Sequence, residues 1–214
     1  MAPNVAAFVR LMLVTDDRLL AGRDLLDVAR GAVAGGVSSV QLRLKDRSAR
    51  EQAALARALV SGLEVPVLVN DRPDIAIAAG AAGVHLGVDD MSVKLVRRIA
   101  PPGFVIGASV GSADEAAEAG QADYWGIGPW RVTTTKADAG ASLGAVGFAR
   151  LVGLAGGRPC IAIGAVRPED AESVRAAGGS GLAVVSGMLA AGDVAAAAAR
   201  YGEAVRRSWG PAAP

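Results

Sequence analysis

The segment AGAAGVHLG, residues 79–87, contains the pattern that decides the fold: an alanine-rich stretch reaches a glycine, and an apolar run begins four positions later. Three other segments repeat it, so that the glycines Gly36, Gly80, Gly120 and Gly178 precede apolar runs that begin at Val40, Val84, Tyr124 and Leu182. A helix that ends at a left-handed glycine and turns directly into a strand accounts for this spacing. We therefore predict four helix–strand junctions.

Four more apolar runs lie between these segments: VRLMLVT at 9–15, VPVLVN at 65–70, FVIGAS at 104–109 and PCIAIG at 159–164. Helical stretches fill the gaps, one of them opening with a capping box formed by Ser48 and Glu51. Strands this apolar are buried on both faces, as in a parallel sheet. Eight strand–helix units in 214 residues favour a single-domain (β/α)8 TIM barrel over an open doubly wound sheet. We expect one domain over residues 1–214, with a short tail from about residue 210 that need not be ordered.

Charge and composition exclude several classes of partner. A formal net charge of +1 gives no electrostatic case for binding nucleic acid or an anionic membrane. The longest uncharged stretch, residues 176–192, is interrupted by glycines and serines and falls short of the roughly 18 apolar residues of a membrane span. The N-terminus lacks a signal-peptide pattern, and the single cysteine, Cys160, is expected to be a buried small hydrophobe. We expect a cytoplasmic protein.

Polar residues terminate the apolar strands. Active sites of such barrels form at the carboxyl ends of the strands, so chemistry is expected there. In chain order these residues are Gln41, Arg43 and Lys45; Asn70 and Asp71; Asp89 and Asp90; Ser109; Thr133, Thr134, Thr135 and Lys136; Gly164; and Ser186 with Gly187.

Two groups among them predict a diphosphate site. Arg43 and Lys45 share one side of an extended segment and suit a multiply charged anion. Asp71 and Asp90 follow neighbouring strands and could together bind Mg2+, which takes one or two carboxylates and completes its shell with water and substrate phosphate. With Lys136 they predict a diphosphate held by cations and a metal. The hydroxyls of Thr133, Thr134 and Thr135, with the glycine-bearing ends of the last two strands, resemble a separate phosphate corner.

Other polar residues have more ordinary interpretations. Asp89 is expected to be a capping or first-turn acid of the helix in MSVKLVRRIA, residues 91–100. Asp16 and Asp17 are expected to be loop residues without an evident partner. His85 lies within a strand and is interpreted as structural. Because it is the only histidine, a histidine-based triad or a histidine-rich metal site is disfavoured.

The motifs VQLRLKD, LVNDRPDIAIAAGAAGVHLGVDD, IGASV, TTTKADAG…LG, AIGAV and AVVSG stand in the order typical of one family. Over nearly the entire chain the sequence resembles thiamine phosphate synthase. The resemblance implies that 4-amino-5-hydroxymethyl-2-methylpyrimidine diphosphate is joined to 4-methyl-5-(2-phosphoethyl)thiazole, with release of diphosphate and formation of thiamine phosphate. It also implies Mg2+ as cofactor and small molecules as partners.

The resemblance further implies roles for individual residues. The pyrimidine diphosphate would be bound by Gln41, Arg43, Lys45, Asn70, Ser109 and Lys136, the metal by Asp71 and Asp90, and the thiazole phosphate by Thr133, Thr135, Gly164, Val185 and Ser186. Arg43, Lys45 and Lys136 would be catalytic through charge stabilisation. The chain departs from the family pattern at Leu44, Gly111, Trp130, Arg131 and Ala165. Trp130 and Arg131 are expected to reshape the loop after the sixth strand, and Ala165 to place a methyl group near the thiazole phosphate, which leaves room for an altered second substrate.

Three other functions stay open at this point. A thiazole tautomerase-like relative would need neither metal nor diphosphate cluster. A Schiff-base lyase would use Lys45 or Lys136 as nucleophile. A precursor-binding barrel without transferase activity would need no leaving-group activation. Self-association into a homo-oligomer is compatible with the sequence.

Overall fold

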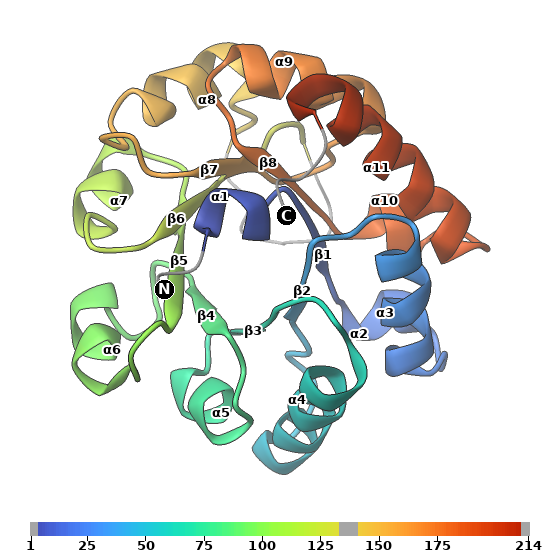
Figure 1. The fold of residues 1–214 in the computed structure, drawn as a ribbon. Coiled ribbons are helices and arrows are strands. Elements are labelled where there is room, and N and C mark those ends of the chain that lie inside the picture. The colour runs from blue at the N-terminus through green and yellow to red at the C-terminus, as the bar shows by residue number, and fades with distance from the viewer. Residues whose placement is uncertain (1–3, 133–140, 211–214) are drawn as a thin grey trace.

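The strands close into a complete ring. The computed structural model describes residues 4–132 and 141–210, and within them the strands are β1 Leu11–Val14, β2 Ser39–Leu42, β3 Val67–Asn70, β4 Gly83–Leu86, β5 Val105–Val110, β6 Tyr124–Ile127, β7 Cys160–Ala162 and β8 Gly181–Val184. Each strand pairs in parallel with the next, and β8 pairs with β1 (Figure 1). The predicted (β/α)8 barrel is confirmed, and the open sheet is excluded.

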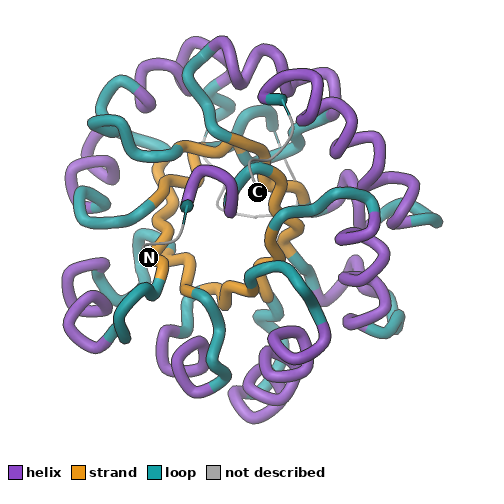
Figure 2. The backbone as a smooth tube through the Cα atoms, viewed as in Figure 1, coloured by secondary structure: helices purple, strands orange, loops and turns teal. Residues whose placement is uncertain are grey.

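Helices surround the ring of strands (Figure 2). Their bounds are α2 Asp17–Leu20, α3 Leu25–Ala34, α4 Ala49–Gly62, α5 Pro73–Ala78, α6 Val93–Ile99, α7 Ala113–Glu118, α8 Gly144–Val152, α9 Ala171–Ala176 after the 3-10 turn η1 Pro168–Asp170, α10 Ser186–Leu189 and α11 Val194–Trp209. The first helix, α1 Val5–Phe8, instead lies across the opening of the ring, where Phe8 packs on side chains inside the barrel.

Glycines end most of the predicted helices as expected. Gly36, Gly80 and Gly178 have φ of +104°, +68° and +86°, in the left-handed region that favours glycine. The prediction is wrong at Gly120, which does not have a positive φ. There the Ala119 carbonyl accepts both the Ala122 amide and the Trp125 indole at 3.0 Å, so the chain turns without a left-handed glycine.

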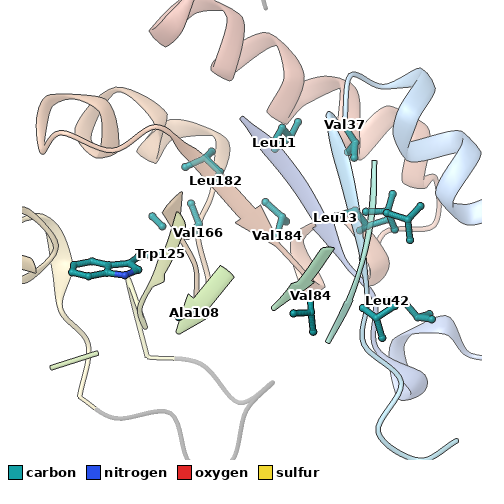
Figure 3. Packing of buried hydrophobic residues seen from close by; sticks show 14 of the residues in the cluster. Leu11, Leu13, Val37, Leu42, Val84, Ala108, Trp125, Val166, Leu182 and Val184 are labelled. Atoms are coloured by element: carbon teal, nitrogen blue, oxygen red, sulfur yellow. The ribbon is translucent and has the colours of Figure 1, made fainter. Parts of the chain in front are cut away.

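Side chains alternate between two apolar layers. From β1, Leu11 and Leu13 point outward to the helices, whereas Met12 and Val14 point into the barrel. Figure 3 shows the outer layer, in which strand residues such as Leu182 and Trp125 pack under the helices. Inside, Phe8 and Met12 join a smaller cluster with residues of β3, β5, β6, β7 and β8. Both strand faces are therefore buried, and the end of the barrel nearest α1 is filled with apolar side chains.

The ends of individual elements agree with the sequence in two further places. In the predicted capping box of α4, the Ser48 amide donates to Glu51 at 2.9 Å and the Glu51 amide donates to the Ser48 hydroxyl at 3.3 Å. The last helix, α11, ends at Trp209, whose indole donates to the Gly179 carbonyl at 2.9 Å. The remainder of the expected tail, 211–214, lies outside the described residues. No helix in the described parts of the chain combines the length and apolarity needed to cross a membrane.

Cys160 provides a test of the barrel core. Its side chain in β7 is inaccessible to solvent, and burial raises the pKa of the thiol to about 12, with Arg158 acting weakly in the opposite direction. Very little reactive thiolate is therefore present at pH 8. We expect the native protein to resist Ellman's reagent while the urea-unfolded chain reacts completely. An Ala58→Cys variant, which places a second thiol on the exposed face of α4, should react with one equivalent at once. Rapid reaction of native Cys160 would contradict this packing.

Candidate active site

The polar residues at the strand ends line one cavity. It has a volume of about 580 Å³ and opens at the carboxyl ends of the strands. Among the residues that line it are the predicted site residues Gln41, Arg43, Lys45, Asn70, Asp71, Asp90, Ser109, Gly164, Val185 and Ser186. The predicted residues Thr133, Thr134, Thr135 and Lys136 lie outside the described residues. Residues dispersed over most of the chain therefore face one space of the size that small-molecule sites have.

The two cations enter the cavity from the loop that follows β2, and each lies beside an aspartate. Arg43 Nη1 lies 3.1 Å from Asp16 Oδ2, and Lys45 Nζ lies 3.2 Å from Asp71 Oδ2. The expectation that Asp16 and Asp17 lack partners is wrong. Asp16 pairs with Arg43, and the Asp17 carboxylate accepts the Asp46 amide at 3.1 Å and pairs with Arg47. These contacts cross from the β1 loop to the β2 loop, so chain separation hides them in the sequence.

Asp71 and Asp90 are close enough for their carboxyl groups to hydrogen-bond. Asp71 directly follows β3 with φ of +63°, a conformation that aspartate tolerates better than most residues. Asp90 accepts the Gly87 amide at 2.6 Å. Burial, followed by the hydrogen bond and charge of Asp71, raises the pKa of Asp90 to about 6, against the opposing effects of the Gly87 amide and Lys45. Two carboxylates in contact favour either a shared proton or a cation between them.

The donor set fits a hard divalent cation. Asp71 and Asp90 supply two carboxylates, and a cation between them would offset both the burial of Asp90 and the charge of Asp71, which raise the pKa of Asp90. Within the described parts of the chain, no group of three or more histidine, cysteine, aspartate and glutamate side chains could hold a metal. Water and substrate oxygens would therefore complete the shell, as is usual for Mg2+. The described residues do not form the closed, all-protein cage that structural zinc requires.

Asp89 does not have its predicted role. The first turn of α6 contains no acidic residue, and its N-cap position is occupied by Ser92, because the helix begins later than expected. Asp89 is exposed and lines the cavity. Another acid that lines the cavity, Glu115, was missed by sequence analysis. Its carboxylate accepts the Gly111 amide at 2.6 Å, and its amide donates to Ser112 at 3.2 Å. The serine three residues before the glutamate was the available signal.

Polar side chains form the floor of the cavity. His85 is 8% exposed, with Nδ1 at 2.9 Å from the Tyr124 hydroxyl and Nε2 at 3.1 Å from the Ser109 hydroxyl. The Gln41 side chain hydrogen-bonds to Tyr124, whose pKa is raised by complete burial. Gly126 leaves room for the histidine, since a Cβ there would lie 3.0 Å from its ring. His85 is thus packed as a structural residue would be, and it also lines the cavity.

The opposite wall contains the glycine-bearing strand ends. Gly164 has φ of +96°, and a Cβ at this position would lie 2.7 Å from Pro129. Ser186 begins α10 and lines the cavity with Val185. Ala165, one of the departures from the family pattern, is exposed at this wall in a left-handed conformation with φ of +50°. Its methyl group therefore stands where the family has only a hydrogen atom.

The other two departures from the pattern on this side have structural partners. Trp130 is buried and packs edge-on against Phe148, with ring centroids 5.6 Å apart. Arg131 pairs with the buried Asp170, and its amide donates to the Gly164 carbonyl at 3.0 Å. Neither is among the described residues that line the cavity. They connect the segment after β6 to the segment after β7, where Gly164 and Ala165 lie.

Comparison with known proteins agrees with this geometry. A family model described as thiamine monophosphate synthase matches residues 11–188. The chain belongs to the thiamine monophosphate synthase family. A thiamine-phosphate synthase of Azorhizobium caulinodans is 48% identical over 196 residues, covering 88% of this chain and 91% of that protein. One of Moorella thermoacetica is 41% identical over 205 residues, covering 94% of this chain and 97% of that protein.

A solved structure, thiamine phosphate pyrophosphorylase from Pyrococcus furiosus, superimposes with a TM-score of 0.85 at 32% identity, covering 96% of this chain and all of that one. The family that the sequence motifs indicated is therefore confirmed. The same relatives support the transferase interpretation of the sequence and give no support to the tautomerase-like alternative. The similarity extends over the whole barrel, so it includes every strand end that lines the cavity.

The Arg131–Asp170 pair gives a prediction about stability and pH. Burial acts to raise the pKa of Asp170, but the hydrogen bonds and charge of Arg131 and the Arg167 amide outweigh it and lower the pKa below the ordinary value. A lowered aspartate pKa contributes stability above about pH 4 that is lost as the pH falls further. We expect Asp170→Asn to lower the free energy of unfolding by about 1–2 kcal/mol at pH 7 and by less at pH 3.

Urea unfolding at the two pH values measures the effect. The matched control is Asp74→Asn, which removes the carboxylate of the exposed Arg72–Asp74 pair and should cost less than about 0.5 kcal/mol. Equal losses for the two variants would show that burial of Asp170 adds nothing to its pairing.

Proposed function

We propose that this chain is a thiamine phosphate synthase that joins 4-amino-5-hydroxymethyl-2-methylpyrimidine diphosphate to 4-methyl-5-(2-phosphoethyl)thiazole. The products are thiamine phosphate and diphosphate. The observation that carries the proposal is that Arg43, Lys45 and the touching pair Asp71 and Asp90 face one cavity. Cations and a metal-binding carboxylate pair together suit a diphosphate that leaves as an anion.

The proposed reaction is dissociative. The bond between the pyrimidine methylene carbon and the diphosphate oxygen breaks, and its electron pair leaves with the diphosphate. The thiazole nitrogen then donates its lone pair to the resulting pyrimidine-methyl cation and forms the new carbon–nitrogen bond. The amino group on the pyrimidine stabilises the cation, so no side-chain nucleophile is required. The protein contributes position and the exclusion of water.

Arg43 and Lys45 are proposed to stabilise the charge that grows on the leaving diphosphate. Both line the cavity, and Arg43 can donate two parallel hydrogen bonds to phosphate oxygens. Lys136 is proposed to act with them, on the strength of the family resemblance alone. Asp71 and Asp90 would hold Mg2+, which when bound supplies further neutralisation of the diphosphate charge.

The polar floor is proposed to bind the pyrimidine. Gln41, Asn70 and Ser109 line this part of the cavity, and Ser109 is oriented by His85 at 3.1 Å. The thiazole phosphate is proposed to bind at the opposite wall, where Gly164, Val185 and Ser186 lie, together with Thr133, Thr134 and Thr135. Ala165 reduces the space at that wall by one methyl group. The two substrates would then meet between floor and wall, where the methylene carbon and the thiazole nitrogen must react.

The rival functions fit the cavity less well. A Schiff-base lysine normally lies desolvated in an apolar pocket. The Lys45 side chain is 56% exposed and ion-paired with Asp71. A precursor-binding barrel would bind both molecules without turnover and has no use for a carboxylate pair beside the diphosphate site.

We also propose that the protein acts on these small molecules in the cytoplasm. The single cysteine, Cys160, is buried and cannot form an intramolecular disulfide, which suits a reducing compartment. The net charge of +1 gives no electrostatic attraction to nucleic acid or to an anionic membrane, so small molecules are the proposed partners.

The test of this function is a two-substrate assay. We expect the protein to convert the pyrimidine diphosphate and the thiazole phosphate, in the presence of Mg2+, to equal amounts of diphosphate and a product with the mass of thiamine phosphate. Omission of either substrate serves as the control. Tight binding of both substrates without product would contradict the synthase function and favour the binding barrel.

The carboxylate pair gives a prediction about the metal. Asp71→Asn and Asp90→Asn keep the size of each side chain and its hydrogen-bond acceptor, and asparagine tolerates φ of +63° at position 71. We expect each variant to lower kcat/KM by on the order of 100-fold. EDTA should abolish turnover of the unmodified protein, and added Mg2+ should restore it.

A readout independent of activity is the rise in melting temperature that Mg2+ causes by binding the folded state. We expect both variants to lose this rise, whereas Asp27→Asn, an exposed substitution on α3, should keep it. Full activity of the unmodified protein in excess EDTA would remove the metal from the mechanism.

A further inference from the structure

Three consecutive residues after β1 contact the segment that carries the two proposed diphosphate cations. Thr15, Asp16 and Asp17 reach from the β1 loop to residues 43–47, which follow β2. The sequence separation is 27 to 30 residues, and the parallel pairing of β1 with β2 brings the two loops together. Their arrangement bears on how Arg43 is held.

Thr15 fixes the backbone of Arg43. Its side chain is fully buried, and its hydroxyl accepts the Arg43 amide at 2.8 Å and lies 3.3 Å from the Arg43 carbonyl. The Thr15 amide donates to the Gln41 carbonyl at 3.0 Å. The pairing of β1 with β2 is thereby prolonged beyond the ends of both strands. These hydrogen bonds fix the backbone position from which the Arg43 side chain extends.

Asp16 fixes the guanidinium of Arg43. One carboxylate oxygen accepts the amides of Arg18 and Leu19 at 3.1 and 3.2 Å, which anchors it to the start of α2. The other lies 3.1 Å from Arg43 Nη1, and the side chains of the pair are only 13% and 20% exposed. Because the carboxylate is tied to backbone on one side, it holds the guanidinium in one place.

Asp16 contacts Arg43 from outside the cavity lining. Of these two residues, Arg43 lines the cavity and Asp16 does not, within the part of the chain that the structure describes. The contact with Asp16 engages Nη1, and a guanidinium has further N–H groups that can bind an anion from the cavity side. Asp17 secures the other end of the same segment by accepting the Asp46 amide.

We propose that Asp16 is a positioning residue for the diphosphate: it preorganises Arg43 so that the guanidinium meets the leaving group without first being ordered. This rests on the proposed function, because it assigns Arg43 to the diphosphate. A purely local role, the capping of α2, would involve only the oxygen that faces the helix. The second oxygen, directed to Arg43, is what distinguishes positioning from capping.

The test uses Asp16→Asn in the full chain. Asparagine keeps an oxygen for the α2 amides and loses the charge that holds Arg43. We expect at least a fivefold rise in the KM for the pyrimidine diphosphate and in the Kd of inorganic diphosphate, measured by titration calorimetry with Mg2+ present. The KM for the thiazole phosphate should change less than twofold. In an Arg43→Ala background, Asp16→Asn should add less than a twofold effect, since its target is gone.

The matched control is Asp24→Asn, which makes the same substitution at the exposed N-cap of α3, where the carboxylate accepts the Asp27 amide. It should leave all three constants within twofold. If Asp16→Asn is poorly folded by circular dichroism, Asp16→Ser, which also keeps a capping oxygen, replaces it.

Equal behaviour of Asp16→Asn and Asp24→Asn would overturn the proposal, as would effects of Asp16→Asn and Arg43→Ala that multiply independently. Both outcomes are distinct from a failure of the proposed function, in which the unmodified protein makes no thiamine phosphate.

Discussion

The closed ring of parallel strands is the constraint on which the remaining structure depends. Because β8 pairs with β1, every strand has one face toward the helices and one toward the inside of the barrel, and both must be filled. Apolar residues, with Phe8 of α1, fill the end of the barrel where the strands begin. The polar residues that remain are concentrated where the strands end, in one cavity.

This concentration brings charged side chains close together in the cavity. Two kinds of contact balance their charges: contacts between groups that line the cavity, and a contact from outside its lining. Burial, with the hydrogen bond and charge of Asp71, raises the pKa of Asp90 and leaves the pair suited to a cation. Lys45 offsets part of that charge from the cavity side. The charge of Arg43 is balanced by Asp16, which does not line the cavity. Under the proposed function, binding of a metal and a diphosphate would change the first group of contacts, whereas the contact between Asp16 and Arg43 need not change.

The departures from the family pattern also separate into two kinds. Trp130 and Arg131, which replace the usual residues of the loop after β6, have structural partners: Trp130 packs on Phe148 and Arg131 pairs with Asp170. They act by bracing the segments after β6 and β7 against each other. Ala165 is different, because its methyl group lies at the cavity wall in a left-handed conformation. If a substitution alters the choice of the second substrate, this geometry favours Ala165 as the responsible residue.

The sequence by itself determined the number and order of the strands, and which polar residues stand at their ends, because apolar runs and glycine spacing are local signals. Periodicity was insufficient at Gly120, where the chain turns through hydrogen bonds to the Ala119 carbonyl without a left-handed glycine, and at Asp89, which lies before the N-cap of α6. Only the tertiary structure decided the pairs, such as Asp16 with Arg43 and Arg131 with Asp170. Their members lie 27 and 39 residues apart, and the pairing of neighbouring strands, together with loop conformation, brings them together. Neither strand pairing nor loop conformation produces a periodic pattern in the sequence.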